Sequence, residues 1–206
     1  MSKSEFASAS YTAGELNAII KLLKKQGGED GPEKFLRGEL TLKLTERMFK
    51  TWKTVKLGTG LKTADDFRKA LTNAGCNIGS WANDILGKPV FSVSSEETEV
   101  ELVVVSVAEL GFKNGATRKD IYKRAEELGF ALCPSEVGPQ LRLRYNDQPN
   151  GEWLLIGMEP IAVSDGDLRV FGVGRDDDGS QWLDGGCGSP VLVWSADLHW
   201  VFLRRK

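Results

Sequence analysis

A cysteine and the single histidine lie twelve residues apart near the carboxyl end of the chain. Cys187 is surrounded by small residues in DGGCGSP, and His199 begins the segment HWVFLRRK. A thiol beside an imidazole can act as a nucleophile with its general base, and the N–H groups of a glycine-rich turn can stabilise an oxyanion. If the two segments are neighbouring strands, Asp184 or Asp197 could orient the histidine. Otherwise Cys187 belongs to a flexible glycine turn and His199 to the surface.

Carboxylates offer a second kind of chemistry. Three glutamates lie in segments that also carry two arginines, and acids beside arginines can form a polar cleft for phosphate or sugar: Glu136, Glu152, Glu159, Arg142 and Arg144. The alternation in QLRLRY, residues 140–145, equally predicts a strand whose arginines face solvent. The candidates for catalysis are therefore Cys187, His199 and Glu136, and the enzyme that they would make is a small hydrolase.

Two aspartate clusters could supply oxygens to a metal ion. Asp165 and Asp167 precede the expected strand 168–175, and residues 176–178 are three consecutive aspartates. Calcium and magnesium need several oxygens around one ion. Eight strand residues at about 3.3 Å each hold the clusters too far apart to share one. We expect two tight turns instead, with Gly179 at a positive φ, and neither a metal nor another cofactor.

Basic residues interleaved with aromatics lie between residues 40 and 62. Such a pattern can bind a phosphate backbone and stack bases, which makes it the candidate nucleic-acid site: Lys43, Arg47, Lys50, Trp52, Lys53 and Lys56. The alternative is a half-buried strand, WKTVKLG, flanked by lysine stems. A helix-turn-helix is a further possibility, but the second helix of the expected pair offers only Asn83, Asp84 and Lys88 to a groove.

The local patterns predict an α+β fold, with a helical amino-terminal part followed by a strand, one helix and a twisted antiparallel sheet. Helical spacing indicates helices near 12–24, 32–40 and 63–74, another through Trp81, Ile85 and Leu86, and one after Thr117. Thr63 with Asp66, and Thr117 with Asp120, have the spacing of capping boxes. Apolar and alternating segments predict strands from residue 100 onwards.

The charges are distributed unevenly along the chain. Residues 1–90 carry 15 Lys and Arg against 10 Asp and Glu, whereas the remainder carries 12 against 19. Together with the polar stretch SVSSEETE, this predicts a mainly helical basic region, 1–91, and an acidic α+β region, 92–206. The asymmetry favours either a nucleic-acid surface on the basic region or a contact between the two regions.

The stretches GELNAIIKLL, FLRGEL, MEPIAVSDGD and GRDDDGSQWL resemble a group of uncharacterised bacterial hypothetical proteins of unknown function. The resemblance implies a bacterial, intracellular origin and no particular activity. Three scattered cysteines and no apolar leader predict a cytoplasmic protein without a membrane partner. We expect a non-enzymatic interaction protein that binds nucleic acid or a protein partner. A small hydrolase using carboxylates or Cys187 is the alternative, and the oligomeric state is left open.

Overall fold

The structure, a computed structural model, describes residues 13–40 and 49–205. The chain forms two compact units, Met1–Glu46 and Arg47–Lys206. This division comes well before the boundary expected at residue 91. Elements between residues 53 and 86 belong to the second unit because they pair with strands from later in the chain.

The first unit contains two helices, α1 (Ala13–Gly27) and α2 (Gly31–Leu36), where the sequence predicts them. The chain turns after α1 at Gly28, whose φ of +85° is a conformation that suits glycine. Pro32 lies in the first turn of α2, where its missing N–H removes no helical hydrogen bond. α2 is shorter than expected, because the chain leaves the helix and Gly38 adopts a φ of +75°.

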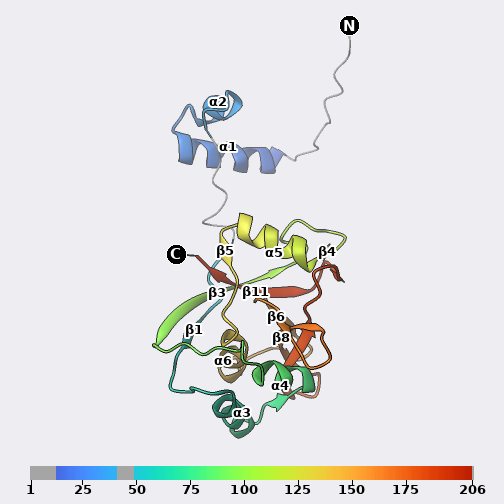
Figure 1. The fold of residues 1–206 in the computed structure, drawn as a ribbon. Helices are drawn as coiled ribbons and strands as arrows, with labels where there is room; N and C mark the ends of the chain where they lie inside the picture. Colours follow the sequence, from blue (N-terminus) through green and yellow to red (C-terminus); the bar gives the residue numbers. More distant parts are fainter. Residues whose placement is uncertain (1–12, 41–48, 206) are drawn as a thin grey trace. The chain divides into compact units, whose positions relative to one another are not determined.

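A curled mixed sheet is the frame of the second unit (Figure 1). Its main path among the described residues runs in the order β1 (Lys53–Leu57), β3 (Thr98–Ser106), β11 (His199–Arg204), β6 (Trp153–Ile156), β8 (Leu168–Arg175), β9 (Gln181–Cys187) and β2 (Asn77–Ile78). β5 (Phe130–Ala131) adds to β11, and β7 (Ile161–Ala162) adds to β8. A separate two-stranded sheet joins β4 (Ala116–Thr117) to β10 (Val193–Trp194).

The α+β class is confirmed, but the sheet is not simply antiparallel. β11 runs parallel to β6, and β2 runs parallel to β9. The last strand, β11, lies between β3 and β6, which come much earlier in the chain. Alternation of side chains indicates which face of a strand is buried, but it does not specify the neighbouring strand or its direction.

Four helices accompany the sheet in the described part of this unit: α3 (Ala64–Asn73), α4 (Ser80–Leu86), α5 (Arg118–Glu127) and α6 (Val137–Arg144). Thr63 and Asp66 form the predicted capping box of α3, and the Thr117 side chain accepts from the Asp120 N–H at the start of α5. The strand expected at 140–145 is wrong, because these residues belong to α6 and its end. α6 is buried over Val137–Arg142, so it lacks the one-sided apolar pattern that reveals a surface helix.

Side chains from helices pack on both faces of the sheet. Tyr122 of α5 contacts Trp200 and Phe202 edge-on, with ring centroids 5.5 and 5.8 Å apart. On the opposite face, Gly138 of α6 lies against Phe171, where a Cβ atom would come within 2.6 Å of the ring. Full burial of a side chain such as Phe171 contributes about 1.5–3 kcal/mol.

Candidate functional site

The structure does not bring Cys187 and His199 together. Cys187 ends β9 and His199 begins β11, and two strands, β6 and β8, lie between them. The strand register places His199 opposite Leu154, Leu154 opposite Val173, and Val173 opposite Leu183 of β9. Leu183 lies four residues before Cys187 on that strand. Three strand spacings of about 4.8 Å and four residues of about 3.3 Å separate the two by roughly 20 Å along the sheet. The neighbouring strands that a nucleophile–base pair requires are therefore not formed.

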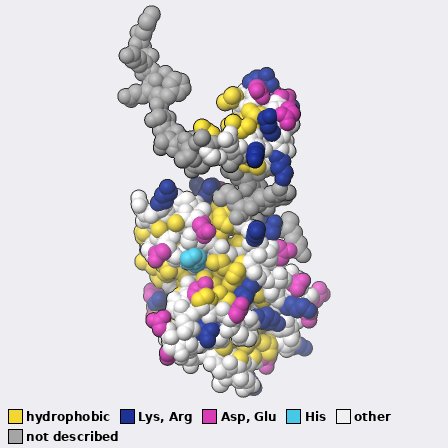
Figure 2. All heavy atoms as spheres, turned by 180° about the vertical axis from the view of Figure 1, so that it is seen from behind, with side chains coloured by type: hydrophobic (Ala, Val, Ile, Leu, Met, Phe, Trp, Pro, Cys, Tyr) yellow, Lys and Arg dark blue, Asp and Glu magenta, His cyan; other side chains and the backbone are white. Residues whose placement is uncertain are grey.

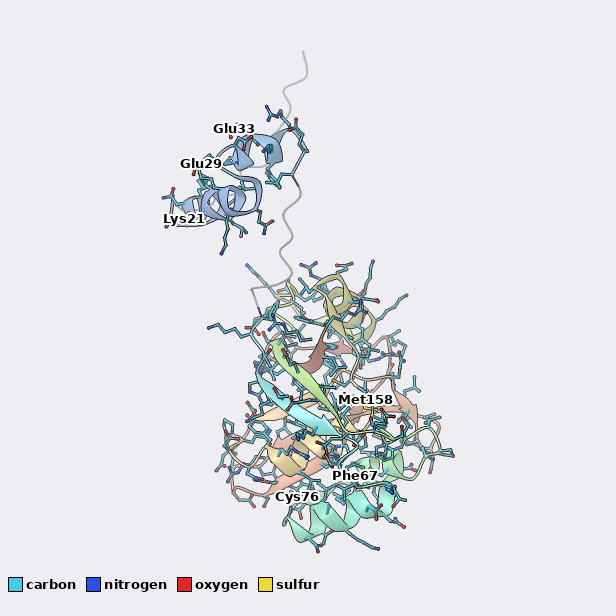
Figure 3. The ribbon with its side chains drawn as sticks, turned by 90° about the vertical axis from the view of Figure 1, so that its left-hand side faces the viewer. Lys21, Glu29, Glu33, Phe67, Cys76 and Met158 are labelled. Carbon is cyan, nitrogen blue, oxygen red and sulfur yellow. The ribbon has the colours of Figure 1, made fainter. Side chains whose placement is uncertain are left out.

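The three cysteines differ in exposure. Cys76, labelled in Figure 3, and Cys133 are buried, whereas Cys187 is half-buried; all three are free. Burial raises the pKa of the Cys76 and Cys133 thiols, because it disfavours the charged thiolate. Cys187 is thus the most accessible thiol. His199 is exposed, and Figure 2 shows its side chain on the surface beside hydrophobic and acidic side chains.

Glu136 is a buried carboxylate whose two oxygens are both occupied. Its Oε1 accepts from the Gly58 N–H at 2.8 Å and from Gln140 Nε2 at 2.9 Å, and its Oε2 accepts from the Ser94 N–H at 2.8 Å. The side chain is 0% exposed. It therefore joins the loop after β1 to the loop before β3 and has no surface on which a substrate could be placed.

Glu152 and Glu159 lie apart from this buried group. Glu152 accepts a hydrogen bond from the Tyr145 hydroxyl at 2.7 Å, and Glu159 is exposed. The glutamates thus have separate surroundings and share no cleft with one another. A hollow of about 390 Å³ beside α5 includes Asp120, Lys123, Arg124 and Glu127 in its lining, and none of the candidate catalytic residues lines it.

Arg142 is fully buried, contrary to the expected solvent-facing strand. Its guanidinium donates to Gln148 Oε1 at 2.5 Å, to the Gly174 carbonyl at 2.9 Å and to the Tyr145 carbonyl. Burial lowers the pKa of Arg142, since desolvation disfavours the cation. Its hydrogen bonds hold the end of β8 against the segment after α6. Arg144 donates to the side chain of Gln140 and thereby extends the Glu136 network.

The candidate nucleic-acid residues that the structure describes are largely engaged with other side chains. Lys53 pairs with Asp147 at 3.1 Å and lies over the Tyr145 ring, and Lys56 pairs with Glu97 at 2.8 Å. Trp52 is half-buried and packs edge-on against Tyr145, with ring centroids 4.9 Å apart.

The local charge on the outward face of β1 is consequently low. Lys56 lies opposite Glu99 in the register of β1 and β3, and Thr54 lies opposite Glu101. Lys50 is exposed, whereas Lys43 and Arg47 lie outside the described residues. A phosphate backbone approaching this strand would meet carboxylates beside the lysines, and like charge opposes its binding.

The polar residues of α4 are also used inside the unit. Asn83 accepts from Arg68 Nε at 2.7 Å, and Asp84 accepts from the Ser164 N–H at 2.6 Å. Lys88 pairs with Asp84 at 3.0 Å. These contacts join α4 to α3 and to the turn after β7. The side chains that a helix-turn-helix would use to contact bases in a DNA groove are therefore engaged with residues of the protein itself.

The two aspartate clusters form turns at opposite ends of β8, as the sequence predicts. Asp178 accepts from the Ser180 N–H, and Gly179 has a φ of +89°. Asp165 accepts from the Asp167 N–H in the other turn. No group of three or more His, Cys, Asp or Glu residues that could hold a metal ion occurs in the described ranges.

A feature that the sequence analysis did not single out is the edge of β10. We use "β10 segment" for residues 190–194. The Leu192 and Pro190 carbonyls accept from the Arg118 and Lys119 N–H groups at the start of α5, and Val193 and Trp194 pair with Thr117 and Ala116 of β4. In the antiparallel register of β10 and β4, the N–H and C=O groups of Val193 point to the other edge, where no described strand pairs with β10.

The side chains along this edge are apolar and open to solvent. Val191 is 76% exposed and Val193 is 62% exposed, while Trp194 packs against Trp200 with centroids 5.6 Å apart. The apolar run PVLVW, residues 190–194, was the available signal, but a buried strand has the same composition.

The class that the fold defines is an α+β protein built on a mixed sheet, with a short helical unit before it. No protein-family model, curated protein or solved structure matches the chain. No helix in the described residues is long and apolar enough to cross a membrane.

Proposed function

We propose that this is a non-enzymatic interaction protein that binds an extended segment of a protein partner by strand addition to the β10 segment. The observation that carries the proposal is the outward-facing backbone of Val193, which no described strand pairs, beside the exposed apolar side chains of Val191 and Val193. An N–H and a C=O group that face outward from a strand edge can pair with another extended chain, and the side chains beside them supply selectivity.

The surroundings of the edge favour a protein over a nucleic acid. Val191 and Val193 offer aliphatic surface, which gains from contact with apolar side chains and not from contact with phosphates. The lysines of β1, in contrast, are paired with Asp147 and Glu97. The free thiols agree with the cytoplasmic location that belongs to this proposal.

The β10 segment is held in place by its neighbours, and this also supports the proposal. β10 is fixed by β4 on one side, and Trp194 is fixed by contact with the fully buried Trp200. An edge that is already extended costs a ligand less ordering entropy than a loop that must first become a strand.

The test is selection of short random peptides displayed on phage against the folded protein, followed by affinity measurement with a synthetic selected peptide. Val193→Pro removes the outward N–H and should weaken binding by about tenfold or more. Val193→Thr keeps the N–H and the β-branched shape, so it is the matched control and should bind within about threefold of wild type. Equal binding by Val193→Pro, or enrichment of no peptide, would show that the edge is not the binding surface.

A further inference from the structure

Trp153 is the one tryptophan among the described residues that is exposed, at 38%. It begins β6 and lies directly opposite Gly174 of the neighbouring strand β8 (Figure 1). A Cβ atom on Gly174 would lie 2.5 Å from both Cε2 and Cε3 of the indole and about as close to Cδ2 between them. A point almost equally far from three consecutive ring atoms lies above the ring and not beside its edge. The Trp153 ring therefore rests with one face on the backbone of Gly174, and its exposed area lies on the outer face and the edge.

A carboxylate follows Gly174 on the same face of the sheet. The pairing of β8 with β9 continues one residue beyond Arg175, since the Asp176 N–H donates to the Ser180 carbonyl at 2.9 Å. Side chains two residues apart in a strand share a face, so Asp176 lies diagonally across from Trp153 at about 7–8 Å, which long side chains can bridge. The Asp176 side chain is half-buried and forms no hydrogen bond or ion pair with a described residue.

The cations near this end of β8 are used on the opposite face. Residues 176–178 are three consecutive aspartates, and Asp177 is exposed. Arg175 alternates with them along the strand and donates to backbone carbonyls, as Arg142 does from α6, which packs on that opposite face. No described cation lies over the Trp153 ring or pairs with the three aspartates. The ring and the carboxylates thus face outward without a counter-charge.

Another tryptophan in the same protein shows which group completes such an arrangement. The Arg169 guanidinium lies over the Trp81 ring, 4.0 Å from its centroid, and pairs with Asp167 at 2.9 Å. A planar cation there touches both an aromatic face and a carboxylate. Trp153 and Asp176 provide the same two partners, and in the described residues the cation between them is missing.

We propose that Trp153 and Asp176 bind the guanidinium group of an arginine in a partner peptide. The face of an aromatic ring carries partial negative charge and attracts a cation, and arginine takes this position more often than lysine. The planar guanidinium stacks flat on a ring and donates to a carboxylate with two parallel N–H groups.

The three aspartates select among the ligands that an exposed tryptophan can stack. A nucleotide would stack its base, but its phosphate would be repelled by the carboxylates. Free arginine would be opposed by its own α-carboxylate, whereas an arginine within a peptide has none. The proposal is independent of strand addition at the β10 segment, because other strands carry the site and either surface can fail alone.

The test is a titration of the isotope-labelled full-length protein with the tripeptide Gly-Arg-Gly, blocked at both ends, followed by NMR of the indole N–H signals. Trp153→Leu identifies the Trp153 signal by its loss, and the signals of the other five tryptophans report whether the fold is kept. The Trp153 signal should move as the peptide is added. The same peptide with lysine should bind at least about threefold more weakly, because its ammonium does not stack as a plane. A peptide with citrulline, which is planar but uncharged, should not bind measurably.

Asp176→Asn tests the carboxylate and keeps a side chain that suits the first position of the turn. It should raise the dissociation constant of the arginine peptide about fivefold or more, since it removes a charged hydrogen-bond acceptor. Glu159→Gln is the matched control. It removes one exposed carboxylate beyond the other end of β6 and should leave the constant unchanged.

Three outcomes would overturn the proposal. They are equal binding of the arginine and citrulline peptides, wild-type affinity in Asp176→Asn, and movement of the Trp153 signal with a neutral disaccharide such as maltose in place of the arginine peptide. Val193→Pro should leave this titration unchanged, so failure here and failure of peptide addition at the β10 segment are measured separately.

Discussion

Removal of the Glu136 carboxylate should destabilise the second unit, because the carboxylate holds two loops together by hydrogen bonds. The carboxylate accepts three hydrogen bonds, from the Gly58 and Ser94 N–H groups and from Gln140, at 2.8 to 2.9 Å. It is 0% exposed, and no cation forms an ion pair with it in the described part of the chain. Glu136→Ala therefore leaves two partly buried backbone donors, the Gly58 and Ser94 N–H groups, without their acceptor.

The magnitude follows from these contacts. A hydrogen bond to a charged group contributes about 1.5–3 kcal/mol, and an orphaned buried donor costs about 1–3 kcal/mol. Since water can enter part of the space, we expect Glu136→Ala to lower the free energy of unfolding by about 3–5 kcal/mol. Glu136→Gln keeps the shape and one carbonyl oxygen, but its NH₂ group faces a donor, so we expect a loss of about 2 kcal/mol.

Urea unfolding followed by tryptophan fluorescence measures these changes. For a chain of this size the larger loss corresponds to a drop in Tm of about 10 °C. Glu159→Gln, at an exposed position, is the control and should change stability by less than about 0.5 kcal/mol. If Glu136→Ala stays within about 1 kcal/mol of wild type, the three hydrogen bonds do not hold the two loops, and the structural role assigned to this residue is wrong.

Three further predictions concern other groups. Arg142→Met should lower the free energy of unfolding by about 3 kcal/mol in the same urea assay, because it removes the donors to the Gly174 and Tyr145 carbonyls and to Gln148; an unchanged midpoint would contradict this. The Ser164 N–H and Lys88 lower the pKa of Asp84 below 3.8, so its stabilising effect is present above about pH 4 and is lost as the pH falls through the folded value; Asp84→Asn should therefore reduce stability at neutral pH but have little effect near pH 2. Iodoacetamide should label Cys187 in the folded protein well before the buried Cys76 and Cys133, which mass spectrometry of peptides can measure, and equal labelling of all three would refute the burial.

The nucleic-acid hypothesis has its own measurement. Because Lys53 and Lys56 are paired with carboxylates, we expect weak retention on heparin that Lys50→Glu, Lys53→Glu and Lys56→Glu together change little. Strong retention that falls with salt and is lost in the triple variant would instead favour binding of nucleic acid through this strand.

Local features of the fold could be predicted from the sequence because short-range physics determines them. The Thr63 and Asp66 capping box lies within one helical turn, and the DDDG turn needs only aspartate oxygens and a glycine at positive φ. The helices of the first unit follow from spacing and from the glycine and proline that bound them. These interactions involve residues close in the chain, so tertiary contacts were not needed to find them.

The tertiary structure decided which distant residues meet. It placed β6 and β8 between Cys187 and His199, and it buried Glu136 among donors from two loops. It also made QLRLRY part of a buried helix, where Arg142 binds carbonyl groups instead of water. The alternation of apolar and polar residues does not encode strand order, and hydrogen bonds between residues far apart in the chain leave no local pattern. The sequence alone thus determined the capped helices and the turns, whereas packing determined the buried helix at QLRLRY and which carboxylate, thiol and strand edge are open to a partner.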